Sequence, residues 1–408
     1  MESVIYFDNN ATTRLAPEAL EAMQPYLAEL YGNPSSIHRF GSEVARKIQE
    51  AREQVAALLG AADPVEVVFT SCGTEGDNAA IRGILEASPG KRHIVTTQVE
   101  HPAVLALCQH LEKKGYRVTW LRVDGEGMLD LDELRDALMD DTALVSIMYA
   151  NNETGVIFPI DAVGEMVKAK GIPFHVDGVQ VAGKIPLTLA KSPVDLLTIS
   201  GHKFHGPKGV GALYVRRGIT FRPFIVGGHQ ERSRRGGTEN VAGIAGMGKA
   251  AEVALKHLGE EEKRVRALRD QLEKSLLDSC PDCRLNGHRG KRIPNTLNVS
   301  FKFLEGEAIL VLLDQHGICA STGSACTAGS VEPSHVLRAM GVPPDWIQGA
   351  VRFSLSRYNT EEEVRFVSEK APLIAQRLLG LSALGKLADR QQYPRDDYRT
   401  GDRIGARR

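Results

Sequence analysis

The stretch DLLTISGHKFHGPKGVGALYV, residues 195–215, decides which fold the chain is expected to adopt. An apolar run at each of its ends predicts a buried strand. Lys203 lies in the turn between them, close to apolar walls, and burial disfavours the charged form of an amine. A neutral lysine is a nucleophile toward an aldehyde, with which it forms a Schiff base. Ser200 and His202 can hydrogen-bond a phosphate beside it, although these residues alone fit an ordinary surface turn equally well.

The composition is that of a globular protein. Of the 408 residues, 42% are hydrophobic and 25% are charged, and the net charge is -1. This balance does not steer the whole molecule toward nucleic acid or acidic lipid. The N-terminus is too short and too acidic for a signal peptide, and no apolar run approaches the roughly 20 residues that span a bilayer. We therefore expect a cytoplasmic protein with neither a nucleic-acid nor a membrane partner.

Strand and helix patterns alternate through the first half of the chain. This alternation predicts an α/β fold with a mostly parallel sheet, in which ligands bind beyond the carboxyl ends of the strands. The predicted strands are 65–70, 93–97, 117–123, 143–149, 172–177, 195–199 and 210–215, and the helices between them are 76–87, 102–113, 130–139 and 160–170. Before them, we expect one helix from Pro17 to Leu30 and a second from Gly41 to Leu59, closed by Gly60.

The second half predicts a smaller α/β unit. A long charged helix, about 240–278, precedes it, and its elements are strands 295–301, 317–320 and 350–355 with helices 306–315 and 360–378. We expect a large domain over residues 15–260 and a small domain made of 1–14 and 261–382. The tail, 383–408, lacks apolar periodicity and is expected to be mobile.

Polar residues follow the successive strands of the larger unit. Gly73 and Thr74 lie in a glycine turn at a helix start, which is an anion site unless Thr74 is a plain N-cap. His101 follows the next strand and can lie flat on an aromatic ring, or simply cap a helix. Asn152 can hold a ring oxygen or a carboxylate, or belong to a turn. The pattern favours a phosphorylated aromatic ligand.

Asp177 ends an apolar strand, where an unpaired carboxylate is costly. It needs a cationic partner, either a pyridinium nitrogen or a neighbouring arginine. A phosphate site, a stacking histidine, an amide, a carboxylate for a ring nitrogen and Lys203 are together the parts of a pyridoxal 5′-phosphate site.

A second centre lies in the segment 317–330, which is rich in small residues. We expect Cys326 to be exposed there, so that its thiol can attack, carry a group and hand it on, unless it is an idle loop cysteine. Arg352 lies inside an apolar strand. Its guanidinium can bind the carboxylate of a ligand in a bidentate manner, or it can form an internal salt bridge. Cys280 and Cys283 have CxxC spacing without a second such pair nearby, which favours two loop cysteines over a zinc site.

These motifs resemble those of the pyridoxal-phosphate cysteine desulfurases, most closely the nitrogen-fixation type called NifS. The resemblance covers residues 4–380 and rests on YFDNNATT (6–13), GNPSS (32–36), TSCGTE (70–75), NNETG (151–155), SGHK (200–203) and GSAC (323–326). It implies fold type I of the pyridoxal-phosphate enzymes, like aspartate aminotransferase and within the class V aminotransferase superfamily. It also implies a large domain with a seven-stranded sheet, a smaller α/β domain, and a homodimer.

The resemblance also implies a role for each matched residue. Lys203 carries the coenzyme as a Schiff base, His101 stacks on its ring, Asp177 binds the ring nitrogen and Gln180 the ring hydroxyl oxygen. The phosphate and its surroundings are held by Gly73, Thr74, Ser200, Gly201 and His202, with Thr238 from the partner subunit. Asn152 also contacts the coenzyme and, together with Arg352, binds the substrate. Cys326 takes the sulfur and is also a candidate iron–sulfur ligand.

The implied reaction converts L-cysteine into L-alanine and leaves a persulfide on Cys326. The implied sulfur acceptor is a NifU-like iron–sulfur scaffold protein that serves nitrogenase. Alternatives are a housekeeping desulfurase for general iron–sulfur assembly or tRNA thiolation, a selenocysteine lyase, an aminotransferase, or an iron–sulfur carrier without enzymatic activity.

Overall fold

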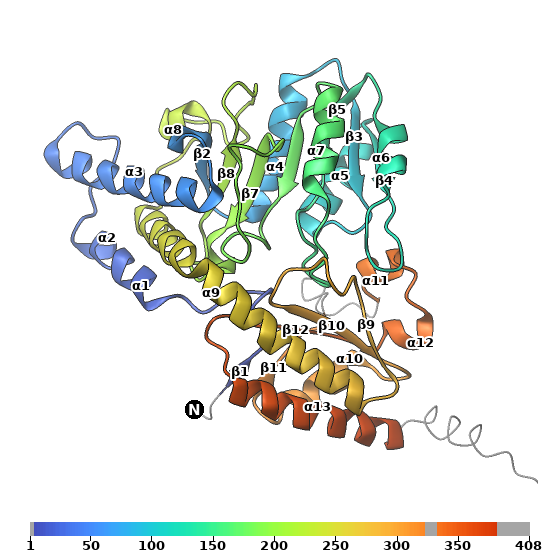
Figure 1. Cartoon of the computed structure of the whole chain (residues 1–408). Helices are drawn as coiled ribbons and strands as arrows, with labels where there is room; N and C mark the ends of the chain where they lie inside the picture. The colour runs from blue at the N-terminus through green and yellow to red at the C-terminus, as the bar shows by residue number, and fades with distance from the viewer. Residues whose placement is uncertain (1–3, 323–332, 382–408) are drawn as a thin grey trace, which may run out of the picture.

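The computed structural model describes residues 4–322 and 333–381, and two sheets joined by one long helix dominate it (Figure 1). The larger sheet has seven strands in the order β2-β8-β7-β6-β5-β3-β4. Their bounds are β2 (Val67–Thr70), β3 (His93–Thr97), β4 (Arg117–Leu121), β5 (Thr142–Ser146), β6 (Phe174–Asp177), β7 (Leu196–Ser200) and β8 (Gly211–Val215).

Only β8 runs against the other strands of this sheet, since its pairs with β2 and β7 are antiparallel and the remaining pairs are parallel. The prediction of a mostly parallel, seven-stranded sheet is therefore confirmed. All residues of β3, β5, β6 and β7 are buried. Burial on both faces explains why these strands appear in the sequence as continuous apolar runs rather than alternating ones.

Four helices follow the first strands of the sheet, as the alternation predicts. They are α4 (Gly73–Ala87), α5 (Pro102–Glu112), α6 (Leu131–Ala137) and α7 (Ile160–Ala169). Because parallel strands need crossover connections, the carboxyl ends of β2, β3, β5, β6 and β7 meet at one edge of the sheet.

The N-terminal helices project from the body of the molecule on the left of Figure 1. The single helix expected from Pro17 to Leu30 is two helices, α1 (Pro17–Met23) and α2 (Pro25–Ala28). Pro25 has no N–H to continue the first helix, so a new helix begins there. Helix α3 (Arg39–Leu59) ends as expected at Gly60, whose φ of 58° is left-handed.

The smaller unit is built on an antiparallel sheet in the order β12-β10-β9, with bounds β9 (Cys283–Leu285), β10 (Thr296–Phe301) and β12 (Ala350–Ser354). Helices α10 (Gly306–Asp314) and α13 (Glu361–Leu381) pack with it. Helix α9 (Val241–Ser279) runs from α3 down to this sheet (Figure 1). The short remaining elements are η1 (Pro64–Glu66), η2 (Gly201–Lys203), α8 (Gln230–Ser233), α11 (His335–Ala339) and α12 (Pro344–Ile347).

One strand near the N-terminus was not predicted. No strand is expected before residue 65, but β1 (Ile5–Tyr6) pairs in parallel with β11 (Ile318–Cys319). A two-residue strand is too short to show a periodic pattern in the sequence. Its formation depends on the tertiary packing of Ile5.

Hydrophobic side chains of the described residues form four buried clusters. One of them contains Phe7, Leu297 and Phe353 and belongs to the smaller unit. Val336 and Leu337 of α11 pack into a cluster that also contains residues of the larger sheet. The domain boundaries expected from the sequence stay a prediction. None of the helices in the described ranges combines the length and apolarity that a bilayer crossing needs.

Candidate active site

A pocket of about 230 Å³ opens at the carboxyl edge of the larger sheet. It collects polar side chains that follow five different strands. Among the residues predicted from sequence, it is lined by Gly73, Thr74, His101, Asn152, Asp177, Gln180, Ser200, His202 and Lys203. This convergence follows from the parallel order of the strands, which places every one of these strand ends at the same edge.

Lys203 ends the 3-10 turn η2 directly after β7. Its Nζ donates to the backbone oxygens of Asn10 at 2.5 Å and Ala11 at 2.8 Å. The N-terminal loop is in turn fastened to this turn, because Thr13 N donates to His202 O at 2.9 Å. A segment that is distant in sequence thus positions the lysine, and sequence reasoning did not assign Asn10 or Ala11 a role.

Two carboxyl groups face the same pocket. Asp177 is the last residue of β6 and its Oδ1 accepts from Val179 N at 2.9 Å. Burial raises the pKa of Asp177, and burial together with Asp177 raises the pKa of Asp77 well above its usual range. A cation placed between these carboxyls would be stabilised. Asp77, on the first turns of α4, was missed because a helical acid gives no local signal of burial.

The start of helix α4 at this pocket suits an anion. Gly73 and Thr74 open helix α4, a 15-residue helix whose N-terminal N–H groups point out of it. Ser200 is 2% exposed, and its buried Oγ has no hydrogen-bond partner among the described residues. A Cβ at Gly73 would lie 2.9 Å from Val179 Cγ2, so the close approach requires glycine. Burial and nearby lysines lower the pKa of His202 to about 4, so its ring is a neutral hydrogen-bonding group here.

His101 has one of the two roles that the sequence leaves open, since it caps a helix. It is the N-cap of α5, and its Nδ1 accepts from Ala103 N at 3.2 Å. Burial lowers the pKa of His101, so the neutral ring carries its proton on Nε2 when Nδ1 accepts. The ring also lines the pocket.

Arg352 lies on β12, beside the pocket rather than in its lining. Its Nη2 is 2.7 Å from Asp8 Oδ1, and its Nη1 donates to Asn152 O at 2.8 Å. The internal salt bridge considered from the sequence is therefore present. Through Asn152, which lines the pocket, the arginine touches the wall of the site.

Besides Arg352, three more predicted residues are not among the pocket lining. Gly201 is buried and donates from its backbone N to Val210 O at 3.0 Å. Thr238 is exposed in the segment between α8 and α9. Cys326, both as sulfur acceptor and as iron–sulfur ligand, lies outside the described residues. Within the described ranges, no group of three or more His, Cys, Asp or Glu side chains is arranged to hold a metal ion.

The residues present fit pyridoxal phosphate. The buried Ser200 hydroxyl beside the start of α4 suits a phosphate, and the buried carboxyls suit a protonated ring nitrogen. Lys203 lies in the same pocket, where its amine can reach an aldehyde.

Known proteins that are similar to this chain show its family. The family model Aminotransferase class-V matches residues 5–367. A protein named cysteine desulfurase from Trichormus azollae is 62% identical over 380 residues, which cover 93% of this chain and 95% of that protein. Cysteine desulfurase NifS from Azotobacter vinelandii is 52% identical over 373 residues, covering 91% of this chain and 93% of that protein.

Solved structures show the same likeness. A structure titled NIFS-LIKE PROTEIN superposes with a TM-score of 0.86 at 44% sequence identity, and the match covers 92% of this chain and 100% of that one. The fold is accordingly fold type I of the pyridoxal-phosphate enzymes. The chain belongs to the aminotransferase class-V family, within which it is a cysteine desulfurase that depends on pyridoxal phosphate.

Proposed function

We propose that this cysteine desulfurase transfers sulfur from L-cysteine to Cys326 as a persulfide, releases L-alanine, and supplies iron–sulfur cluster assembly for nitrogenase. The observation that carries the proposal is the meeting of Lys203, Asp177 and Ser200 in one pocket. The NifS name of the Azotobacter relative supports the nitrogenase role. A solved structure titled SspA in complex with cysteine, with a TM-score of 0.77 and 34% identity over 87% of this chain and 100% of that one, supports the substrate.

Each site residue predicted from the sequence has a part in this proposal. Pyridoxal phosphate supplies an aldehyde for amino groups and a ring that stabilises negative charge at the substrate's Cα. Gly73, Thr74, Ser200, Gly201 and His202 hold its phosphate end, Asp177 keeps its ring nitrogen protonated, Gln180 binds its ring hydroxyl, and His101 covers its ring.

Lys203 moves the proton. Its amine takes a proton from the Cα of the substrate, and the carbonyls of Asn10 and Ala11 orient the amine by accepting its N–H groups. Because both acceptors are backbone oxygens of one loop, they fix the position of Nζ with little reorganisation.

Cys326 takes the sulfur. Its thiolate, the nucleophilic form, attacks the sulfur of the substrate. A sulfur–sulfur bond forms and the carbon–sulfur bond breaks. The electron pair of that bond stays with the carbon, which takes a proton and leaves in L-alanine.

The substrate carboxylate binds Arg352, and Asn152 contributes from the pocket wall. Since Asp8 occupies one side of the Arg352 fork, the substrate competes with this carboxylate for the same guanidinium.

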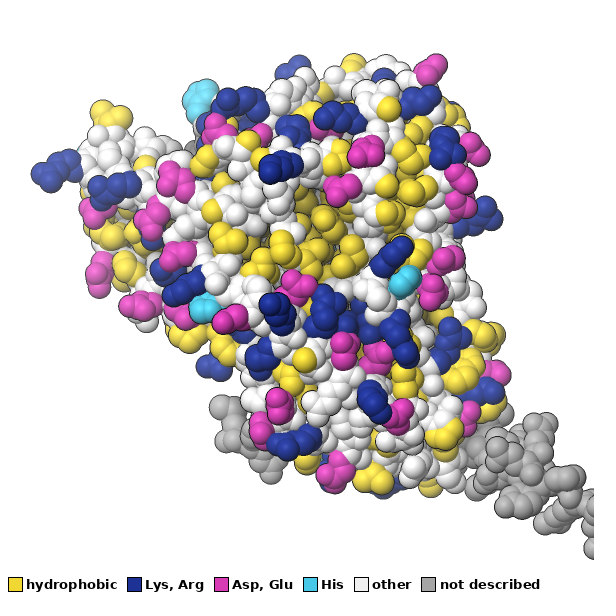
Figure 2. Space-filling model, in the orientation of Figure 1, with side chains coloured by type: hydrophobic (Ala, Val, Ile, Leu, Met, Phe, Trp, Pro, Cys, Tyr) yellow, Lys and Arg dark blue, Asp and Glu magenta, His cyan; other side chains and the backbone are white. Residues whose placement is uncertain are grey.

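A homodimer completes the site, with Thr238 of each subunit binding the phosphate of its partner. The position of Thr238, exposed and outside its own pocket, supports this arrangement. Large apolar side chains also lie exposed near the projecting N-terminal helices and after β8, among them Leu27, Tyr31, Ile37 and Val226. Figure 2 shows that hydrophobic side chains gather in a patch on the face in view, with Lys and Arg side chains below it.

Hybrid dimers test this arrangement. Subunits carrying Lys203→Ala and subunits carrying Thr238→Ala are each impaired alone. Mixed dimers have one site with an intact lysine and an intact partner threonine, so mixing restores activity. A mixture no more active than its parts would contradict the shared site.

The persulfide is tested by incubating the enzyme with L-cysteine and measuring the mass of the peptide that contains Cys326. We expect the addition of one sulfur atom, and none in Cys326→Ala. The proposed acceptor is a NifU-like scaffold protein in the cytoplasm, and Cys326 is also the proposed iron–sulfur ligand. Transfer of labelled sulfur to a purified scaffold of that type tests the acceptor.

A further inference from the structure

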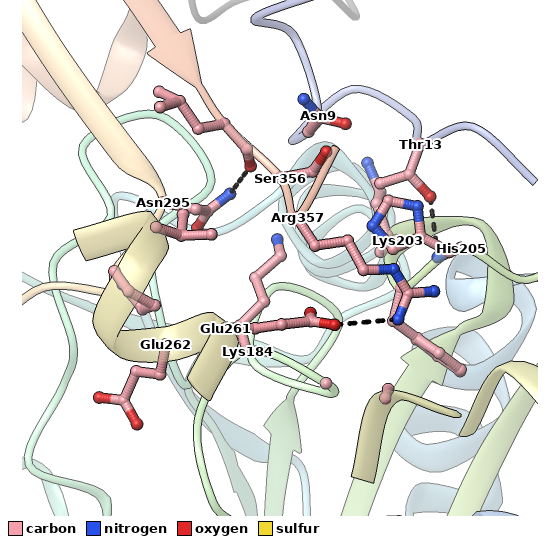
Figure 3. Close-up of a pocket in the computed structure, with 16 residues that line it drawn as sticks. Asn9, Thr13, Lys184, Lys203, His205, Glu261, Glu262, Asn295, Ser356 and Arg357 are labelled. Carbon is pink, nitrogen blue, oxygen red and sulfur yellow. Dashed lines mark hydrogen bonds and ion pairs between the residues drawn. The ribbon is translucent and has the colours of Figure 1, made fainter. Parts of the chain in front are cut away.

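Lys184 has no role in the proposed reaction, yet it lies between the coenzyme pocket and a second cavity. This cavity has a volume of about 40 Å³, enough for roughly three waters. Lys184 and Lys203 both line it, together with Asn295, Glu261 and Arg357. Figure 3 shows the amine of Lys184 pointing into the cavity between Asn295 and Arg357. A role for Lys184 at the neighbouring pocket rests on the proposed function, in which that pocket holds the coenzyme.

Lys184 and the backbone oxygen of Asn10 together fix which way the amide of Gln180 faces. Its Nζ donates to Gln180 Oε1 at 2.7 Å, and Gln180 Nε2 donates to Asn10 O at 3.0 Å. A backbone oxygen only accepts, so the nitrogen of the amide must face Asn10 and its oxygen must face the lysine. Nε2 carries a second N–H beyond the one given to Asn10, and Gln180 lines the coenzyme pocket.

Asn10 ties this arrangement to the catalytic lysine. Asn10 is 1% exposed, and its backbone oxygen accepts from both Gln180 and Lys203. Its side-chain Oδ1 accepts from Lys184 Nζ at 3.3 Å and from Asn295 Nδ2 at 3.0 Å. A change at Lys184 therefore reaches the pocket through Gln180 and through one loop residue.

The surroundings of Lys184 favour an anion nearby. The side chains of Asn10 and Gln180, which accept from its amine, are neutral amides. Burial is the main cause that lowers the pKa of Lys184 well below its usual range, and the charges of Lys203 and Arg352 add to it. The charged and titratable groups that face Lys184 are Lys203, His202, His205, Arg352, Arg357, Glu261 and Glu262. Glu261 is engaged by Arg357 at 3.1 Å.

We propose that Lys184 is a positioning residue that holds the Gln180 amide with an N–H toward the coenzyme pocket, where it stabilises negative charge on the ring oxygen of the coenzyme. The amine donates to Gln180 Oε1 in either protonation state, so the orientation does not depend on its charge. The ring oxygen carries its negative charge without compensation once the nitrogen of Lys203 has lost its proton. A hydrogen bond from Gln180 to this oxygen therefore stabilises the deprotonated state most. Removing the donor therefore makes that proton harder to lose.

The test is the pH midpoint of the visible absorbance of the coenzyme-bound enzyme, together with the dissociation constant of pyridoxal phosphate. In Lys184→Met we expect the midpoint to rise by about one pH unit and the dissociation constant to rise about tenfold. Lys191→Met is the matched control, because Lys191 is an exposed lysine of the same connection between β6 and β7. It leaves both quantities as in the wild type.

A double-variant cycle tests whether Lys184 acts through Gln180. Gln180→Ala alone gives the same shift, and Lys184→Met combined with Gln180→Ala shifts the midpoint no further than either single variant. A purely structural role for Lys184 would lower thermal stability without moving the midpoint, and that result overturns the proposal. Additive shifts overturn it too.

Gln180→Glu gives a second test that does not depend on the folding of Lys184→Met. The new carboxylate pairs with Lys184, removes the N–H donor and brings negative charge toward the ring oxygen, so the midpoint rises. An unchanged midpoint contradicts the proposal. A wild-type protein without any coenzyme absorbance would instead refute the proposed function, so the two failures are distinguishable.

Discussion

Nη2 of Arg352 lies 2.7 Å from Oδ1 of Asp8, so the N-terminal loop and strand β12 meet in an ion pair at the edge of the active site. The arginine side chain is 2% exposed. Because the same guanidinium is the proposed anchor for the substrate carboxylate, we expect Asp8 to compete with L-cysteine for it.

Asp8→Asn is expected to lower KM for L-cysteine, since the substrate no longer displaces a competing carboxylate. The same change leaves a buried arginine without its charge partner, so we expect the free energy of unfolding to fall by about 2 kcal/mol. Arg352→Lys is the companion variant. It keeps the charge but loses the fork, and we expect KM to rise about tenfold. Steady-state kinetics and chemical denaturation measure both effects, and an unchanged KM in Asp8→Asn would contradict the competition.

The pair between Arg52 and Glu231 is expected to stabilise the segment that leads to Thr238. It is bidentate, at 2.7 and 2.8 Å, and Glu231 also accepts from Phe69 N at 3.0 Å. Arg52→Met leaves Glu231 buried and unpaired, so we expect a loss of about 3 kcal/mol.

The matched control is Arg117→Met, which breaks an ion pair with Asp141 whose side chains are about half exposed. It should cost less than about 1 kcal/mol. Denaturant unfolding measures the free energy of unfolding of both variants. Equal decreases would show that the buried Arg52–Glu231 pair stabilises the protein no more than the exposed pair does.

Because of Glu100, we expect the free energy of unfolding to fall as pH rises. The carboxyl is fully buried, and burial raises its pKa from 4.5 to about 8. Between these values the folded protein keeps a proton that the unfolded chain releases, so this group lowers the free energy of unfolding by about 1.4 kcal/mol per pH unit. Glu100→Gln should remove that slope between pH 5 and 8, relative to wild type. Glu126→Gln, at an exposed glutamate, should keep it.

His175 is expected to have the opposite effect at acidic pH, where the free energy of unfolding rises with pH. Burial lowers its pKa from 6.5 to about 3, so the unfolded chain binds a proton that the folded protein excludes. Stability from this group is present above pH 6.5 and is lost as pH falls toward 3, by about 1.4 kcal/mol per unit. His175→Gln should flatten the acid limb of the stability curve. His316→Gln, at an exposed histidine, is the control and should leave the limb unchanged.

The strand ends show how much of the site could be predicted. Strand β3 has the bounds expected from its apolar run, and residues that follow successive parallel strands must meet at one edge. His101 and Asp177 could therefore be assigned to one pocket from the order of apolar runs and polar residues along the chain. Local sequence patterns are sufficient to place these two residues at one edge of the sheet.

The remaining features depend on contacts between distant segments. Asp8 and Arg352 are 344 residues apart, and Asn10 and Lys184 are 174 apart. No periodicity or turn motif connects such pairs. From the sequence, Lys184 cannot be distinguished from an exposed lysine in a loop. Only the fold brings Gln180 and Asn10 next to its amine.

The central claim is that Lys203 holds pyridoxal phosphate in this pocket, and borohydride reduction tests it most directly. Reduction fixes the coenzyme to the lysine that carries it, and peptide mass analysis then identifies that lysine. We expect a single pyridoxyl group on the peptide containing Lys203, with loss of the visible absorbance in Lys203→Ala. A label on Lys184, or a Lys203→Ala protein that keeps the absorbance, would contradict the account.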